Sequence, residues 1–150
     1  MERVNEKYGW VVYLALSLLW LVVGLYQIFL PRELAVDDVQ LVLNLPLGDL
    51  EASSPLAMDF AFWLYGSLGL LKVSWSLFVL AITLTGFKKG EKWAWYTLWL
   101  VPALLVSTGL FNTFYIGDVS QMLQWVPILS LSLLGLLLPY RKFFPKQPRV

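Results

Sequence analysis

The sequence predicts an all-α integral membrane protein built as a bundle of four transmembrane helices. Hydrophobic residues make up 59% of the 150 residues and charged residues only 14%, whereas a soluble domain has about 25% charged residues. Four apolar runs are each long enough to form a helix that crosses the hydrocarbon core. Basic residues are also distributed unevenly between the connections of these runs.

The four apolar runs give the order of the expected spans within a single domain over residues 1–150. They cover residues 10–30, 60–87, 93–111 and 119–139. We expect a helix for each, because a helix satisfies its own backbone hydrogen bonds in lipid. The first run is too long for the apolar region of a signal peptide, and no small-residue cleavage site follows it. It is therefore interpreted as a membrane anchor.

Prolines mark where these helices begin, bend and end. Pro31 is expected to end the first helix, and Pro55, which follows two serines, to open the second. Within the third and fourth runs, Pro102 and Pro127 each remove one backbone hydrogen bond and so predict kinks. Pro139 is expected to end the fourth helix.

The connection between the first two spans, residues 31–54, is acidic and predicts a short external segment at the membrane interface. Residues 34–45 fit a helix and a short strand equally well, because periodicity does not distinguish the two in so short a run. Our expectation is a short interfacial helix followed by a turn at residues 45–49.

Nine basic residues fall on one side of the predicted bundle, and only Arg32 and Lys72 lie elsewhere. Lysine and arginine are retained on the cytoplasmic side during insertion. Both termini are therefore expected in the cytoplasm, and the protein in the cell membrane as a multi-pass protein. The nine residues are Arg3, Lys7, Lys88, Lys89, Lys92, Arg141, Lys142, Lys146 and Arg149.

A turn with three lysines leads into aromatic residues at the start of the third span. Indole rings prefer the membrane interface because one edge is apolar and the other is polar. We interpret this segment as an interface anchor, with lysines that bind a lipid head group as the alternative. The residues concerned are Lys88, Lys89, Lys92, Trp93, Trp95 and Trp99.

The segment 86–105 also resembles a pattern found in small prokaryotic membrane proteins of four helices. The pattern is a basic residue, Gly, Glu, a basic residue and Trp-Ala-Trp at the start of the third helix, and residues 89–95 carry it here. These proteins are similar to the DoxX-like group. The resemblance implies a four-helix membrane fold and no particular reaction.

The chain has no histidine and no cysteine. It therefore lacks the commonest general base, a thiol nucleophile and the commonest ligands of zinc and haem. We expect no catalytic residue, no metal site and no cofactor, and we prefer a non-enzymatic function while leaving a membrane-embedded enzyme open. A lipid-modifying enzyme would have to use Lys72, Tyr65 or Asp59 as its acid or base.

Lys72 is the single charged residue deep within an apolar run. A lysine at the centre of a membrane helix costs about 2.5–3.5 kcal/mol, which favours a position facing the bundle interior. Asp59, on the same predicted helix, is about 20 Å away at 1.5 Å per residue. The amine is either the polar anchor of a pocket for an anionic or carbonyl-bearing lipophile, or a structural group. A structural amine would bond to backbone carbonyls or hydroxyls, or reach water along a groove. Its charge state stays open, because burial disfavours the charged form.

Small and polar residues accompany Lys72 at helical spacing and recur in the other runs. Such stripes are typical of helix packing in membranes, and they are also the candidate lining of a ligand pocket. The candidate ligand-binding residues are Lys72, Tyr65, Ser76, Tyr13, Ser17, Gln27, Thr108 and Asn112.

The preferred function is binding of a lipid or lipophile, or service as a small subunit of a membrane assembly. The expected partners are the bilayer, a lipophilic ligand, and a second copy of the chain or another membrane protein, but no nucleic acid. The alternative is a small transporter or channel for an anionic solute, with Lys72 as its charged station. That alternative would need a dimer, because four helices enclose little space.

Overall fold

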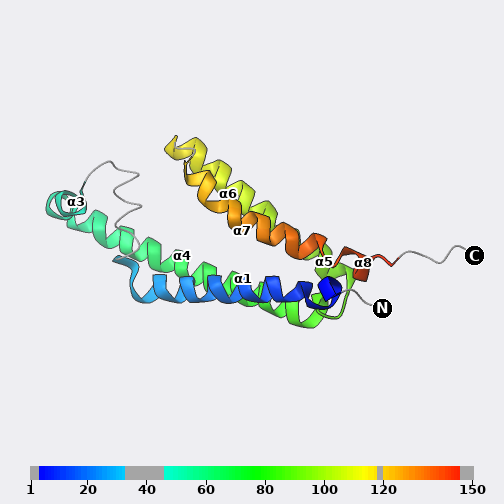
Figure 1. Ribbon diagram of the computed structural model, residues 1–150. Helices are drawn as coiled ribbons and strands as arrows, with labels where there is room; N and C mark the ends of the chain where they lie inside the picture. Colours follow the sequence, from blue (N-terminus) through cyan, green and yellow to red (C-terminus); the bar gives the residue numbers. More distant parts are fainter. Residues whose placement is uncertain (1–3, 33–45, 118–119, 146–150) are drawn as a thin grey trace, which may run out of the picture. The chain divides into compact units, whose positions relative to one another are not determined.

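The computed structural model describes residues 4–32, 46–117 and 120–145, and Figure 1 shows that these ranges are mostly helical. No strand occurs within these three ranges, so the predicted all-α class is confirmed for them. The elements are α1 (Val4–Phe29), α3 (Leu47–Ser53), α4 (Pro55–Ile82), the π-helix η1 (Thr83–Phe87), α5 (Lys92–Leu98), α6 (Leu100–Ile116), α7 (Ser120–Leu137) and α8 (Tyr140–Phe143).

Four helical stretches are long and apolar enough to cross a membrane, namely Tyr8–Phe29, Pro55–Phe87, Lys92–Tyr115 and Trp125–Phe143. Each overlaps one of the four apolar runs found in the sequence. Large apolar side chains remain exposed along them, and Phe114, for example, is 87% exposed. Soluble proteins rarely leave so much contiguous apolar surface uncovered. The length and surface of these helices therefore suit a lipid environment.

The chain divides into two compact units, and the boundary between them passes through α1 and α4. The first unit comprises Met1–Leu18 and Phe78–Val150, and the second comprises Leu19–Leu77.

In the second unit, α1 and α4 pack backbone against backbone at two glycines. A Cβ atom added to Gly69 would lie 2.9 Å from the carbonyl oxygen of Gly24, and one added to Gly24 would lie 3.0 Å from the carbonyl oxygen of Gly69. Glycine permits this close approach because it has no side chain, as in many membrane helix pairs. The face of α4 that carries Gly69 and Lys72 is therefore turned toward α1.

The helix boundaries in this unit follow the two prolines expected to set them. α1 ends at Phe29, two residues before Pro31, and α4 begins at Pro55. The turn predicted at residues 45–49 is wrong in extent, because it opens the helix α3. The amide of Asp49 donates to the carbonyl of Pro46 at 3.1 Å, and the acidic side chain lies in the first turn, where it is favourable.

The interfacial helix or strand predicted for residues 34–45 lies outside the described residues.

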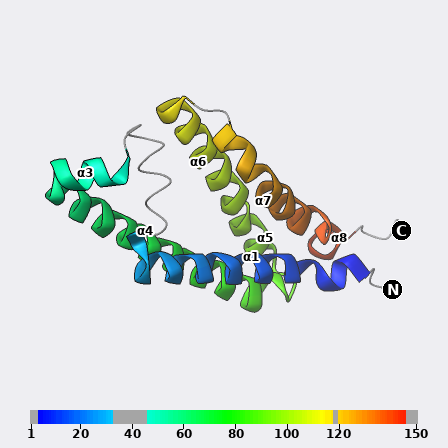
Figure 2. The ribbon, with the colours of Figure 1, turned by 60° about the vertical axis from the view of Figure 1, so that its left-hand side comes forward.

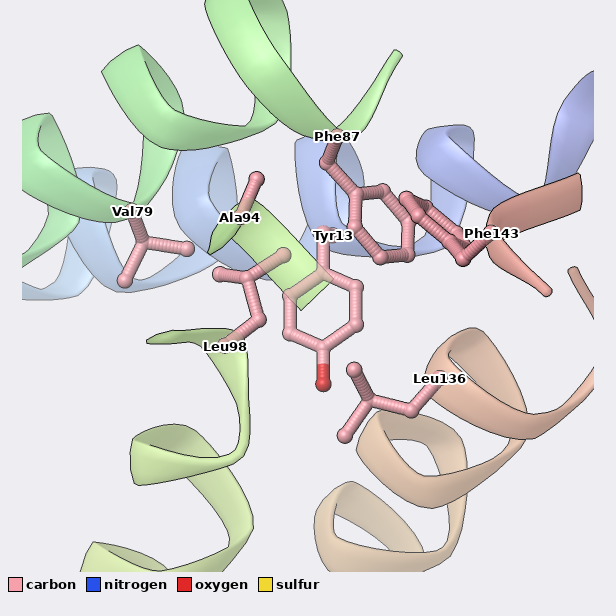
Figure 3. Packing of buried hydrophobic residues seen from close by; sticks show 7 residues of the cluster. All are labelled: Tyr13, Val79, Phe87, Ala94, Leu98, Leu136 and Phe143. Atoms are coloured by element: carbon pink, nitrogen blue, oxygen red, sulfur yellow. The ribbon is translucent and has the colours of Figure 1, made fainter. Parts of the chain in front are cut away.

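The core of the first unit packs around Tyr13 (Figure 3). The Tyr13 hydroxyl donates to the carbonyl of Ser132 at 2.9 Å, and its ring meets Phe87 edge-on at 5.5 Å between centroids. Side chains from α1, α4, η1, α5, α7 and α8 contribute to this core. Its buried members are Tyr13, Val79, Phe87, Ala94, Leu98, Leu136 and Phe143.

The third apolar run is broken at Trp99, between α5 and α6. Pro102 has no N–H, so the carbonyl four residues earlier, at Leu98, loses its usual helical donor. At the same place the amide of Trp99 donates to the carbonyl of Tyr96, three residues earlier, at 3.2 Å. In a regular α-helix this amide would donate to the residue four positions earlier. The kink predicted from Pro102 is confirmed, whereas α7 continues through Pro127 as one helix.

α6 and α7 lie side by side within the first unit (Figures 1 and 2). α6 ends at a left-handed residue, Gly117, whose φ is 78° and whose amide donates to the carbonyl of Thr113 at 2.9 Å. A left-handed glycine at this position is a common way to satisfy the last carbonyls of a helix.

Gly90, in the connection between η1 and α5, is the second left-handed glycine, with φ of 83°. A Cβ atom at this residue would also lie 3.2 Å from Cε and 3.3 Å from Cγ of Lys142. We expect Gly90→Ala to lower the free energy of unfolding by about 1–2 kcal/mol, mainly through left-handed strain. Unfolding in detergent, followed by circular dichroism, measures this loss.

Gly117→Ala is the matched control, because Gly117 has similar strain but nothing within 4 Å of its added Cβ. Gly90→Ala should be the more destabilising of the two. An effect smaller than that of Gly117→Ala would contradict the contact between the Lys142 side chain and the turn.

Candidate functional site

The side chain of Lys72 extends from α4 to α1 within the second unit. Its Nζ atom donates to Oε1 of Gln27 at 2.7 Å and lies 5.7 Å from the centroid of the Trp20 ring. Gln27 is only 2% exposed, so the bond is shielded from solvent. In its protonated form the amine makes a stronger bond than a neutral group would, and the ring then adds a cation–π attraction. Two side chains of α1 thus fix the position of the amine.

The Lys72 side chain is directed toward the amino-terminal end of α4. Side chains in a helix tilt toward its amino terminus, and Gln27 stands in the last turn of α1. Arg32 follows α1, pairs with Glu51 at 2.9 Å and lies 5.9 Å from the Phe62 ring centroid. Phe62 and Lys72 are about 15 Å apart along the helix axis. The amine therefore points from the centre of α4 toward its charged, exposed end.

Two further predicted ligand residues lie near Lys72 on α4. Ser76 is 1% exposed, and its hydroxyl donates to the carbonyl of Lys72 at 2.6 Å. The hydroxyl thus bonds to the backbone of its own helix, four residues earlier, as serine commonly does in membrane helices. Tyr65 is half-buried on the same helix. The structure thus brings the Lys72 amine and Gln27 together, while Ser76 lies one turn beyond Lys72 on the carboxyl-terminal side and Tyr65 lies two turns away.

Two other predicted residues, Tyr13 and Ser17, are buried in the first unit. The Tyr13 hydroxyl is bonded to a carbonyl of α7, and the Ser17 hydroxyl donates to the carbonyl of Leu14 at 2.9 Å. Both groups are satisfied by the protein itself. These internal bonds fit helix packing, which is one of the two interpretations that the sequence allowed for the polar stripes.

The last two predicted ligand residues lie on α6. Asn112 is half-buried, but Thr108 is exposed, so the expectation of an inward-facing Thr108 is wrong. The buried positions of α6 are Pro102 and Gly109, seven residues apart on one face. Thr108 is one residue away from that stripe, and one residue rotates a helix by about 100°.

The second candidate region is the lysine turn, residues 88–92, at one end of the first unit. Lys88 places its Nζ 4.6 Å from the centroid of Trp10, and Lys92 places its Nζ 5.5 Å from that of Phe144. Lys142 donates from Nζ to the carbonyl oxygen of Lys88 at 2.8 Å. Residues from α1 and from the end of the chain therefore join the turn.

Trp95 packs against other residues of the first unit. It is half-buried, and its indole N–H donates to the carbonyl of Leu136 at 3.1 Å. Its ring lies 5.6 Å from Trp99 and 5.2 Å from Phe144, edge to face in both cases. Trp95 thus contributes to the packing of the first unit, and its role as an interface anchor stays a prediction. Trp93, in contrast, is 50% exposed.

Sequence reasoning missed the contribution of α8 to the lysine turn. Tyr140 and Phe144 stack at 4.9 Å between centroids and both contact Trp95. Their spacing of four residues, directly after Pro139, is a signal that a short aromatic helix continues beyond the fourth span. Lys142 lies between them on that helix.

Within the described ranges, no three acidic residues lie close enough together to hold a metal ion. No known protein family, curated protein or solved structure matches the chain. The resemblance to DoxX-like proteins stays a prediction.

Proposed function

We propose that the protein is a non-enzymatic, multi-pass membrane protein that binds the acidic group of a lipophilic ligand at Lys72. The hydrogen bond between Lys72 and Gln27 is the observation that carries this proposal. Gln27 orients the amine without adding negative charge. A carboxylate or phosphate entering beside this pair would gain a charge-assisted hydrogen bond in a medium of low dielectric constant.

The surroundings of the amine favour a ligand with a hydrocarbon tail. The Trp20 ring lies on one side of Nζ, and Val73 on α4 packs against Gly24 of α1. Apolar side chains of α4 near Lys72 remain exposed, among them Leu71, which is 65% exposed. An acyl chain lying along this surface would keep its carboxylate within reach of the amine.

The proposed topology places four spans across the cell membrane with both termini in the cytoplasm. The uneven distribution of lysine and arginine supports it. In this orientation α3 and Arg32 are external, and the Lys72 amine points toward the outer head groups. A ligand with its acidic group at the outer surface would therefore meet the amine without crossing the bilayer centre.

The chain has no cysteine, so single cysteines can test the topology directly. Ala52 in α3 and Lys89 in the lysine turn are both exposed. We expect a membrane-impermeant maleimide to label Ala52→Cys in intact cells, and Lys89→Cys only after permeabilisation. Labelling of Lys89→Cys in intact cells would contradict the orientation.

The ligand site is tested with a fatty acid that carries bromine next to its carboxyl group. Bromine quenches tryptophan fluorescence at close range, and Trp20 is adjacent to the proposed site. Purified wild-type protein should show a saturable quenching component. Lys72→Met, which keeps an unbranched side chain, should lose that component. The same loss is expected for Trp20→Phe, because the reporting indole is removed.

Two controls test whether quenching depends on the charge of the probe and on the charge at Lys72 in particular. The methyl ester of the same probe has no charge and should not saturate. Lys89→Met removes a charge from an exposed position of the lysine turn and should leave the quenching curve unchanged. Coincident curves for wild-type protein and Lys72→Met would rule out the proposed ligand site.

A further inference from the structure

We propose that the lysine turn and α8 form a second binding site, which takes the head group of an anionic phospholipid. The inference rests on the membrane placement proposed above and is independent of the ligand at Lys72. Its residues lie at one end of the first unit, in segments that are far apart in the sequence.

Lys142 connects α8 to the lysine turn. Its ammonium donates to the carbonyl oxygen of Lys88 at 2.8 Å. The stem of the same side chain passes close to Gly90, where a Cβ atom would lie 3.2 Å from Cε. The left-handed backbone at Gly90 and its missing side chain leave room for this stem. The two basic segments therefore meet at one place.

Aromatic rings hold two further ammonium groups of the turn. Lys88 lies over Trp10 at 4.6 Å, and Lys92 lies over Phe144 at 5.5 Å. Cation–π contacts of this length restrict where a lysine side chain moves. An anion that binds here meets donors that are already ordered, which reduces the entropy lost on binding.

Positive charge is concentrated in these two segments. Residues 88–92 and 140–143 contain five basic side chains and one carboxylate, that of Glu91. Like charges held at close quarters repel, so an anion that binds among them is favoured. The basic residues are Lys88, Lys89, Lys92, Arg141 and Lys142.

The level of the site along the helices indicates a lipid as the source of the anion. Trp93, Tyr96 and Tyr140 are exposed beside the lysines, at 50%, 59% and 47%. Exposed indole and phenol rings next to long apolar helices occupy the zone of the lipid head groups. The anion present at that level in a bilayer is the phosphate of an anionic phospholipid, which attracts juxtamembrane lysines.

Native mass spectrometry of the protein in nanodiscs tests the site. Wild-type protein should retain phosphatidylglycerol over phosphatidylcholine when both are offered. Lys88→Gln combined with Lys142→Gln should weaken this preference about 30-fold, since each basic residue near anionic lipid contributes about fivefold. Lys146→Gln combined with Arg149→Gln removes the same charge from the tail and should leave most of the preference intact.

A second variant separates loss of charge from loss of structure. Lys88→Arg combined with Lys142→Arg keeps both charges. The preference of this variant for phosphatidylglycerol should stay within about twofold of wild type, which is less than the roughly fivefold change expected for loss of one basic residue. Equal losses in the Gln pair and the tail pair would overturn the site, because they would indicate general electrostatics alone. Retention of inorganic phosphate in phosphatidylcholine nanodiscs, at the expense of added phosphatidylglycerol, would also overturn the lipid assignment.

Lys72→Met distinguishes this inference from the proposed function. It should lose the brominated fatty acid and keep phosphatidylglycerol, because Lys72 belongs to the other unit. Loss of phosphatidylglycerol in Lys72→Met would contradict the independence of the lysine-turn site.

Discussion

Tyr13→Ala should destabilise the protein by about 3–5 kcal/mol, the range found when a large buried aromatic side chain is truncated. Tyr13 is 0% exposed and is a member of the buried cluster of the first unit. Its ring contacts Phe87, and a Cβ atom on Gly135 would lie only 2.9 Å from the Tyr13 ring. Truncation would leave a cavity that neighbouring backbone cannot readily fill.

The Tyr13 hydroxyl contributes a separate, smaller part of this loss. It donates to the carbonyl of Ser132, so Tyr13→Phe removes one buried hydrogen bond and keeps the ring. A cost of about 1–2 kcal/mol is expected for that change. Figure 3 shows the ring between Phe87, Leu98 and Leu136, which is the packing that Tyr13→Phe preserves.

Unfolding of the purified protein in mixed micelles, titrated with a denaturing detergent, measures both changes. The order of stability should be wild type, then Tyr13→Phe, then Tyr13→Ala. Val22→Ala, at a position 63% exposed on α1, is the control for loss of apolar surface. A Tyr13→Ala protein as stable as Val22→Ala would show that Tyr13 does not hold the core together.

The helices were predictable because length and composition determine them. A run of about 20 apolar residues has few alternatives to a helix in lipid, and Pro31 and Pro55 lie at helix boundaries because proline lacks the N–H that a helix interior needs. Periodicity also predicted which face of α4 is buried. Ser76 is buried at helical spacing from Lys72, and so are Gly69 on α4 and Thr83 at the start of η1.

Pairing between helices was not predictable, because it depends on register. The sequence indicated that Lys72 needs a polar partner, but it did not indicate that Gln27 is that partner. That partnership requires the close contact of Gly24 with Gly69, which sets how α1 lies along α4. The direction of the lysine side chain follows from the same register.

For two residues, the pattern along a single helix did not predict the environment of the side chain. Trp95 carries the amphipathic ring expected at a membrane interface, yet its N–H reaches the carbonyl of Leu136. Thr108 is polar and suited to an interior seam, but the packed face of α6 is set by Pro102 and Gly109. In both cases tertiary contacts decide the outcome, and single-helix patterns carry no information about them.

Gly69→Ala should link the packing of the second unit to its proposed function. The added methyl group would lie 2.9 Å from the carbonyl oxygen of Gly24 and 3.0 Å from the backbone nitrogen of Ile28. Because both neighbours are backbone atoms, the helices must separate, at a cost of about 1–3 kcal/mol. Separation lengthens the bond between Lys72 and Gln27, so the brominated fatty acid should bind more weakly as well.

Gly66→Ala provides the matched control on the same helix. Nothing lies within 4 Å of a Cβ atom at Gly66, so the change removes backbone flexibility and should stabilise α4 by about 0.5–1 kcal/mol. Detergent unfolding and the quenching titration are run on both variants. Equal stability of the two proteins would contradict the glycine contact. A destabilised Gly69→Ala protein that still quenched like wild type would instead show that the ligand site does not depend on the register of α1 and α4.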